Sequence, residues 1–276
     1  MKSRQLAFSF APTPVNEAKG VTIQRAVGAE RMALLDPILL LDHASIAPGS
    51  PTVGFPRHPH RGIETLSYVL AGEVGHKDSI GNDGTVGANG SQWMTAGNGI
   101  FHEEMLVAEA DGAEMIQLWF SLPKALKRVP PAYVGAEPSQ IPLVGSESGN
   151  VRVVAGSYEG TDGPFQGIAV RPTVLDVELN PGGQMEIPTE PGASTIAYAV
   201  RGSLVVDGHT LPAPRLLVFA DGDQVEITAG PNAGRFLFVS AQPLNEPVLQ
   251  FRSFVMNTPE DIQETLAMIA SGEFGK

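Results

Sequence analysis

The sequence predicts an all-β protein built from two copies of one β domain. Short runs of β-branched and aromatic residues alternate with glycine, proline and aspartate, as in a β-sandwich or a β-barrel. Glycine (31 residues) and proline (23 residues) are frequent in the 276-residue chain, whereas charged residues make up only 17%. A chain of this length folds either as two domains or as one large β domain.

The predicted strands follow one another along the whole chain. The first runs cover residues 20–27, 37–42, 63–70, 114–122 and 150–157. After about residue 165 come six more runs, with the sequences PTVLDVEL, STIAYAV, SLVVDG, RLLVFA, QVEITA and RFLFVSA. Each run is rich in residues that favour strands and is bounded by residues that favour turns.

One helix is predicted near the C-terminus, in the sequence NTPEDIQETLAMIASGEFG. Thr258 is a favourable N-cap, Pro259 suits the first helical position, and Gly272 ends the pattern. The apolar residues Ile262, Leu266 and Ile269 fall on one face of the helix, which we expect to pack against the sheet.

An internal repeat supports the duplicated domain. The segment TLSYVLAGEV (65–74) aligns with TIAYAVRGSL (195–204) at a constant offset of 130 residues. The identical positions are Thr65 and Thr195, Tyr68 and Tyr198, and Gly72 and Gly202. The Gly/Pro/Ser-rich connection GAEPSQIPLVGSESGN, residues 135–150, is the expected boundary.

Composition excludes several functions. The formal charge is −12 and there is no basic patch, so we expect no direct nucleic-acid binding. The absence of cysteine excludes disulfides, zinc–thiolate sites and cysteine nucleophiles. The N-terminal apolar run LAFSFA is too short for a secretory signal, and no apolar stretch could span a membrane. We therefore expect a soluble, cytoplasmic monomer that binds no membrane.

Four side chains form a candidate metal site. His58 and His60 lie in FPRHPHRGIETLSY, and their spacing places both imidazoles on one face of a strand. His102 and Glu104 in GIFHEEM repeat that spacing. Two adjacent strands could bring the four together, and such a set suits Fe(II), Mn, Ni or Cu with open coordination positions. Pro59 requires an edge strand, a strand start or a bulge. The alternative is that the H-x-H pair is a chance surface feature.

The other histidines have weaker functional signals. His76, with Asp78 and Asn82 nearby, could orient the ligands from outside the coordination sphere, or could be part of a hairpin turn. His43 and His209 are isolated in the sequence and are expected to be structural or exposed.

Three aromatic residues are candidates for a ligand pocket. Trp93 and Phe101 lie in QWMTAGNGIF, and Phe55 precedes the histidine pair. They could line an apolar pocket for an aromatic ligand. Core packing is the alternative explanation for these residues.

Longer motifs carry a family resemblance. FPRHPHRGIET, HKDSIGNDGTV, QWMTAGNGIFHEEM, LDPILLLDH and PLNEPVLQFRSFVMNTPEDIQ resemble the pirin family of the cupin superfamily, in the same order and over most of the chain. The resemblance implies two tandem cupin (jelly-roll-like) β-barrels with a short C-terminal helix. Residues 1–140 would form the metal-bearing barrel, and residues 141–276 would form a barrel without metal ligands, together with the helix.

The resemblance also implies the ligands and the metal. His58, His60, His102 and Glu104 would hold one divalent ion, usually iron, with Mn, Ni, Cu, Co or Zn as alternatives. Glu64 occupies a position where many cupins place a ligand, but the pirin pattern implies that it is not one here.

The chain departs from the family pattern at some positions. Arg57 replaces a more common aspartate and is expected to add positive charge near the metal. RSFVMNT replaces the usual GPFVMNT. In the second half, the offset of 130 places Pro188 and Glu190 opposite the histidine pair, so that barrel should be free of metal.

Two functions follow from the resemblance. The first is a quercetin 2,3-dioxygenase-like enzyme that cleaves a flavonol or a related enolisable aromatic compound with O₂ and releases carbon monoxide. Glu104 would be the general base, and Phe55, Trp93 and Phe101 would pack the flavonol rings. The second is a non-enzymatic, iron- or redox-sensing regulator that binds a transcription factor or a metabolic enzyme.

Overall fold

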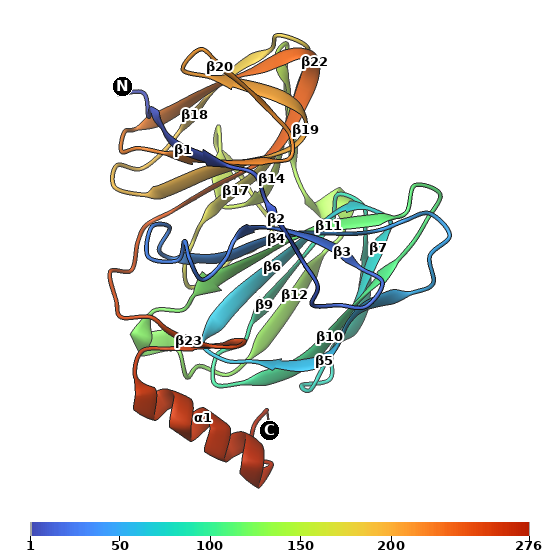
Figure 1. Cartoon of the computed structure of the whole chain (residues 1–276), viewed down its shortest axis with the longest axis vertical. Coiled ribbons are helices and arrows are strands. Elements are labelled where there is room, and N and C mark those ends of the chain that lie inside the picture. Colours follow the sequence, from blue (N-terminus) through green and yellow to red (C-terminus); the bar gives the residue numbers. More distant parts are fainter. Residues whose placement is uncertain (1, 276) are drawn as a thin grey trace.

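The computed structural model describes residues 2–275 and contains two β-barrels stacked along the long axis of the molecule (Figure 1). Two sheets form the first barrel, with strand orders β12-β9-β6-β11-β4-β3-β2 and β5-β10-β7-β8. A nine-stranded sheet, with the main order β1-β21-β19-β22-β17-β14-β13, forms the second barrel. The predicted all-β fold with two tandem cupin barrels is confirmed.

The strands of the first barrel are β2 (Thr13–Val15), β3 (Thr22–Val27), β4 (Ile38–Ile46), β5 (Val53–His60), β6 (Ile63–Ala71), β7 (Glu73–Asp78), β8 (Asp83–Gly87), β9 (Ser91–Thr95), β10 (Ile100–Val107), β11 (Ala113–Ser121) and β12 (Ala132–Ala136). The second barrel contains β1 (Leu6–Phe10), β13 (Leu143–Ser146), β14 (Gly149–Ala155), β17 (Thr173–Leu179), β18 (Gln184–Pro188), β19 (Ser194–Val206), β20 (His209–Pro212), β21 (Arg215–Phe219) and β22 (Gln224–Ala241). There are also two short hairpins, β15 (Ser157–Tyr158) with β16 (Thr161–Asp162) and β23 (Leu249–Phe251) with β24 (Phe254–Met256). The remaining elements are two 3₁₀ turns (Lys124–Leu126 and Pro138–Gln140) and helix α1 (Pro259–Ser271).

The internal repeat corresponds to equivalent positions in the two barrels. Gly72 and Gly202 both adopt positive φ angles, of 65° and 70°. A Cβ atom at either position would lie 2.7 Å or less from a backbone carbonyl oxygen of a neighbouring strand. Glycine recurs at this position because only glycine combines this backbone conformation with such a close approach.

The two tyrosines of the repeat join the barrels. Tyr68 on β6 donates a hydrogen bond of 2.7 Å to Asp176 on β17 of the second barrel. Tyr198 on β19 lies in reciprocal fashion 3.2 Å from Nδ1 of His43 on β4 of the first barrel. His43, expected to be structural or exposed, is therefore structural. An apolar core from both barrels surrounds these contacts and includes Leu66, Trp93, Phe120, Ile196 and Leu237.

Each end of the chain packs on the barrel formed by the other half. Strand β1 pairs with β21 in the second barrel, although the sequence predicted residues 1–140 to form the first. Helix α1 lies against the first barrel, away from the second (Figure 1). Its Thr265 accepts a 2.7 Å hydrogen bond from the buried Arg61. The boundary predicted at residue 140 lies between β12 and β13, which belong to different sheets.

The ends of helix α1 agree with the sequence prediction, but its buried face differs. Thr258 forms a capping box with Asp261, and Gly272 ends the helix at a φ of 72°. Ile262 is buried, as expected. Leu266 and Ile269 are 42% and 37% exposed, so the predicted apolar face is wrong for these two residues. The helix is rotated so that Thr265 meets Arg61, because a buried guanidinium requires a hydrogen-bond acceptor.

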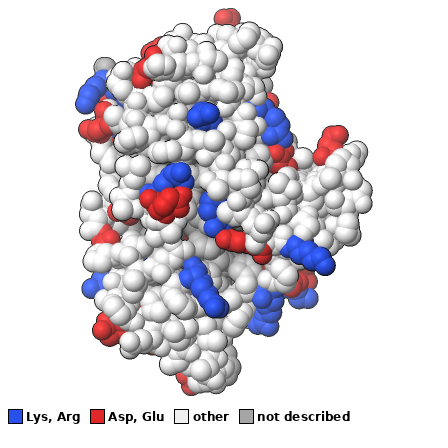
Figure 2. All heavy atoms as spheres, in the orientation of Figure 1, with Lys and Arg blue, Asp and Glu red and all other residues white. Residues whose placement is uncertain are grey.

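None of the helices within residues 2–275 is long and apolar enough to cross a lipid bilayer. Figure 2 shows acidic and basic side chains interspersed on one face of the molecule, separated by large uncharged areas. This face therefore presents no extended basic patch to a nucleic acid.

The tyrosine contacts give a stability prediction. Tyr68→Phe should lower the free energy of unfolding by about 1.5–3 kcal/mol, because it removes a hydrogen bond to a charged group. Tyr198→Phe, whose partner is an imidazole, should cost about 0.5–1.5 kcal/mol. Urea unfolding of the two variants measures both losses of stability. Equal losses would contradict the expectation that the hydrogen bond to the charged Asp176 is the stronger of the two.

Candidate metal centre

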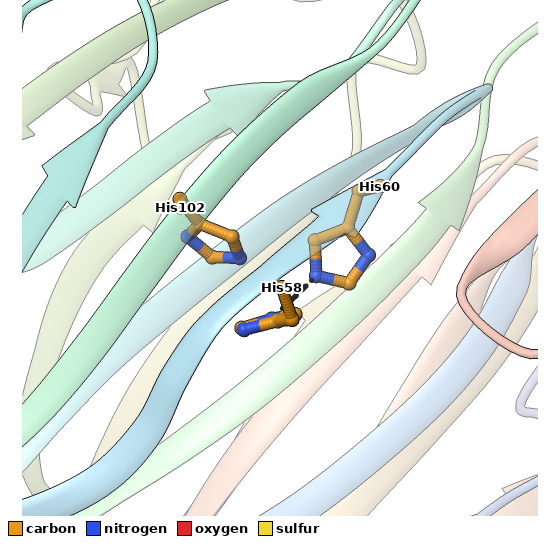
Figure 3. A group of neighbouring side chains, drawn as sticks. All are labelled: His58, His60 and His102. Carbon is orange, nitrogen blue, oxygen red and sulfur yellow. Dashed lines mark hydrogen bonds between the residues drawn. The ribbon is translucent and has the colours of Figure 1, made fainter. Parts of the chain in front are cut away.

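Three histidines from two neighbouring strands converge inside the first barrel. Antiparallel pairing of β5 with β10 places His58 directly opposite His102. The imidazoles of His58, His60 and His102 point toward one another (Figure 3), with ring centroids 4.4–4.9 Å apart. The Nε2 atoms of His58 and His60 lie 2.9 Å apart. The predicted meeting of the H-x-H pair with His102 is therefore present in the fold.

The local geometry of β5 explains how it tolerates its prolines. Strand β5 forms one edge of its four-stranded sheet, where the missing N–H of Pro59 breaks no interior ladder. Its register with β10 shifts between His102 and Glu104. A Cβ atom at Gly54 would lie 2.2 Å from the carbonyl oxygen of Glu104, so glycine permits the close approach of the two strands.

His60 and His102 are buried and His58 is partly buried, and burial favours the neutral imidazole that binds a metal. Burial lowers the pKa of His58, although a hydrogen bond with the Pro56 carbonyl opposes the shift. Burial and neighbouring imidazoles lower the pKa of His60 and His102 well below the usual value. Among residues 2–275 neither ring nitrogen of His102 has a hydrogen-bond partner. Neutral, unpartnered imidazole nitrogens are the ligand form that divalent metals require, so the donor set fits such an ion.

Glu104 is the carboxylate of the cluster. Burial raises its pKa to about 7, although the Ser67 hydroxyl, which hydrogen-bonds to it, opposes the shift. One of its carboxylate oxygens lies within 4.8 Å of one ring nitrogen of His76 and one of His102, and these two nitrogens lie within 4.8 Å of each other. One ring nitrogen each from His58, His60 and His102 forms a second group of the same size. His102 thus belongs to two overlapping groups of possible ligands, one with His58 and His60 and the other with His76 and Glu104.

His76 and Asp78 lie beside the cluster on β7. His76 pairs with Glu104, and Asp78 with His102, in the register of β7 and β10. Nε2 of His76 lies 3.1 Å from Asp78, and its ring stacks on Tyr133 with centroids 4.0 Å apart. Asp78 also accepts hydrogen bonds from Asn82 and from the Ile80 backbone, so it both builds the hairpin turn and orients His76.

A cavity of about 530 Å³ opens over the cluster. This volume is typical of small-molecule sites. It is lined by aromatic and aliphatic side chains, by candidate ligands and by residues from the C-terminal hairpin: Leu40, Phe55, Pro56, Trp119, His58, His60, Glu104, Gln117, Glu17, Arg25, Asp42, Gln250, Arg252 and Ser253. Phe55 is therefore placed as the sequence indicated.

Trp93 and Phe101 do not line this cavity, contrary to expectation. Trp93 lies in the core between the barrels, nearly parallel to Phe120. Phe101 lies on the outer face of β10, in contact with Phe274. Adjacent side chains on a strand point to opposite faces, so applying this rule around His102 would have excluded Phe101.

Arg57 and Glu64 also point away from the cluster. The Arg57 guanidinium lies over the outer ring of Phe101, 4.7 Å from its centroid, so the expected positive charge beside the metal is wrong. Glu64 accepts hydrogen bonds from Thr95 and from the Ala169 backbone. It belongs to neither group of possible ligands, in agreement with the pirin pattern.

Trp119 and a row of polar residues inside the barrel were not identified from the sequence. Trp119 packs edge-on against His60, with centroids 4.9 Å apart. The row crosses adjacent strands and consists of Asp42, Gln117, Ser67 and Gln92. Ser67 in this row positions Glu104. The polar row could have been found from the sequence as four polar residues at strand positions that face inward. Such positions indicate a site, because buried polar groups require a structural or functional reason.

The second barrel holds apolar residues at the matching positions. The corresponding row, defined by the same strand register, is Leu175, Phe238, Ala197 and Leu217, all in its apolar core. Pro188 ends β18, and the exposed His209 lies on β20. The interior that surrounds the histidine cluster in the first barrel is therefore filled by hydrocarbon in the second.

Comparisons with known proteins agree with this architecture. Residues 20–120 match the pirin family, and residues 174–275 match the pirin C-terminal cupin domain. The chain is 33% identical to a Vibrio cholerae protein named "Putative quercetin 2,3-dioxygenase", covering 99% of this chain and 98% of that protein. It is 34% identical to rat pirin, covering 96% and 91%.

Solved structures show the same fold. Quercetin 2,3-dioxygenase from Acinetobacter baumannii superposes with a TM-score of 0.91 at 31% identity, covering 99% of each chain. A bacterial pirin from Escherichia coli, solved in complex with nickel(II), has a TM-score of 0.66 at 19% identity, covering 86% of this chain and all of that one. The second likeness is evidence for the fold alone.

The raised pKa of Glu104 predicts how the metal-free protein responds to pH. Between pH 4.5 and about 7 the unfolded chain loses the Glu104 proton, whereas the folded chain keeps it. Through this window Glu104 alone should therefore destabilise the metal-stripped protein as pH rises, by up to about 3 kcal/mol. The buried histidines, whose pKa values are lowered, contribute in the opposite direction. In Glu104→Gln the free energy of unfolding, measured with urea, should lack the Glu104 contribution to its pH dependence. Equal pH slopes for the variant and the parent would refute the prediction.

Proposed function

Because the chain belongs to the pirin family, we propose that it is a metal-dependent dioxygenase acting on a flavonol or a related enolisable aromatic compound. His58, His60, His102 and Glu104 would hold one divalent ion, with iron the first choice. The observation that carries this proposal is the convergence of His58 and His60 on His102, whose two ring nitrogens have no partner among residues 2–275, beside a cavity of about 530 Å³.

A divalent ion bound at this position would supply a Lewis acid that lowers the pKa of a substrate hydroxyl, with open coordination positions for oxygen chemistry. The protein supplies the base. Without a metal, burial raises the pKa of Glu104 to about 7. A divalent ion beside it would favour the ionised carboxylate, which would accept the hydroxyl proton. The Ser67 hydroxyl would keep the carboxylate oriented toward the substrate.

The cavity walls suit an aromatic substrate. Phe55, Trp119 and Leu40 provide flat and aliphatic surfaces against which aromatic rings can pack. Gln117 presents a polar group on the same wall. Packing of these walls around the substrate would exclude water from the reacting atoms and strengthen the interactions of Glu104.

His60→Ala tests the proposed ligand set. The purified chain should contain a divalent metal. With O₂ present, it should convert quercetin, measured as a decrease of the long-wavelength absorbance of quercetin. A chelator should abolish this decrease. His60→Ala should bind the metal much more weakly and show no turnover. His209→Ala, on the exposed β20 strand, is the matched control and should behave like the parent protein.

Trp119 provides a readout that is independent of turnover. Because it contacts His60, titration of the metal-stripped protein with Ni(II) should quench its fluorescence. The quench should disappear in Trp119→Phe, which retains Trp93. Absence of bound metal under every loading condition would contradict the proposed site. Bound metal without turnover would favour the alternative function, an iron- or redox-sensing regulator with a protein partner.

Asp78→Asn tests the hydrogen bond between Asp78 and His76, which lies outside the proposed ligand set. Asp78 orients His76, which lies against His102 and Glu104. Loss of such a partner typically weakens metal affinity about 10–100-fold. We expect a loss of this size in the Ni(II) titration, together with a lower thermal midpoint because Asp78 also holds the hairpin turn. Asp83→Asn, whose carboxylate lies on the exposed part of the same hairpin, should leave the affinity unchanged.

A further inference from the structure

The turn of the C-terminal hairpin forms part of the cavity mouth. Arg252 and Ser253 connect β23 to β24 and line the cavity together with Gln250. Ser253 donates a hydrogen bond of 2.6 Å to the carbonyl oxygen of Pro59, the residue between His58 and His60. Gln250 donates a hydrogen bond of 2.9 Å to the carbonyl oxygen of Arg252. These two bonds fix the turn relative to the candidate metal ligands.

Arg252 has an unfavourable backbone conformation for its residue type. Its φ angle is 55°, in the left-handed region where glycine is free of strain and an arginine is not. Strain of this kind persists where the surrounding structure imposes it, and it is concentrated at ligand sites. Arg252 is one of seven non-glycine residues with positive φ among residues 2–275, and it is the one that lines the cavity, where its exposed side chain can reach a bound ligand.

The charges around the cavity leave Arg252 available. The other cavity arginine, Arg25, is occupied, because it binds the carboxylates of both Glu17 and Asp42 at 2.7–2.8 Å. Within residues 2–275 the Arg252 guanidinium forms no ion pair, and it lies over the ring of Phe251. The Oε1 atom of Gln250 is buried and has no hydrogen-bond partner in the same part of the chain.

We propose that the substrate carries a carboxylate remote from its metal-facing oxygens, that Arg252 binds this carboxylate, and that Gln250 accepts a hydrogen bond from a neighbouring hydroxyl. Arginine suits this task because its planar guanidinium matches a carboxylate with two parallel hydrogen bonds. The proposal rests on the proposed function, because the rest of the molecule would lie against His58, His60 and Glu104. It narrows the substrate class to acidic aromatic or enolic compounds.

Binding to the full-length, Zn(II)-loaded protein tests the proposal without turnover. The probes are a 3-hydroxyflavone bearing a 4′-carboxylate and the same compound bearing a 4′-carboxamide, followed by quenching of Trp119 fluorescence. The parent protein should bind the acid at least 10-fold more tightly than the amide. Arg252→Gln should remove this preference and leave the affinity for the amide unchanged. Arg57→Gln, with its side chain outside the cavity, is the matched control and should keep the preference.

Arg252→Gly separates recognition from folding. It relieves the backbone strain, so its thermal midpoint should equal or exceed that of the parent while the preference for the acid is lost. Equal binding of the two probes by the parent, or a preference that survives Arg252→Gln, would overturn the proposal and leave the proposed function intact. Failure of both probes to bind the metal-loaded protein would overturn the proposed function as well.

Discussion

The structure depends on the buried contact between the two barrels. Tyr68 reaches Asp176 in one direction and Tyr198 reaches His43 in the other, within a shared apolar core. Strand β6 is buried on both faces because it lies between this core and the interior of the first barrel. Its outward Tyr68 fixes the strand to the second barrel, and its inward Ser67 holds Glu104. The second barrel therefore positions the candidate site without contributing a ligand.

The exchange of chain ends strengthens this dependence. The hairpin of β23 and β24 comes from the end of the chain, yet it contacts β5 through the bond from Ser253 to Pro59. It also pairs through its backbone with Arg61, the residue that follows β5. Strand β5 is an edge strand with two prolines, so it has few ladder hydrogen bonds of its own. The hairpin compensates for this deficit at the strand that carries His58 and His60.

The sequence was informative wherever a local rule applied. Strand periodicity placed His58 with His60 and His102 with Glu104, and the repeat marked the equivalent Tyr68 and Tyr198. For Trp93 and Phe101 the sequence left a ligand pocket and core packing as alternatives; Trp93 packs in the core between the barrels and Phe101 packs against Phe274. The contact of Ser253 with Pro59 could not be found, since 194 residues separate them and no local pattern connects them. The buried face of α1 was missed for a similar reason, because the partner of Thr265 is the distant Arg61.

The two barrels show what the site costs in stability. In equivalent rows, the second barrel has Leu175, Phe238, Ala197 and Leu217, whereas the first has Asp42, Gln117, Ser67 and Gln92. Hydrocarbon in such positions stabilises a barrel, but buried polar groups do so only when they are paired. Unpartnered imidazole nitrogens add to this cost in the first barrel. A duplicated fold can keep such an interior because the apolar barrel and the shared core supply stability, and a bound ligand would satisfy the remaining polar groups.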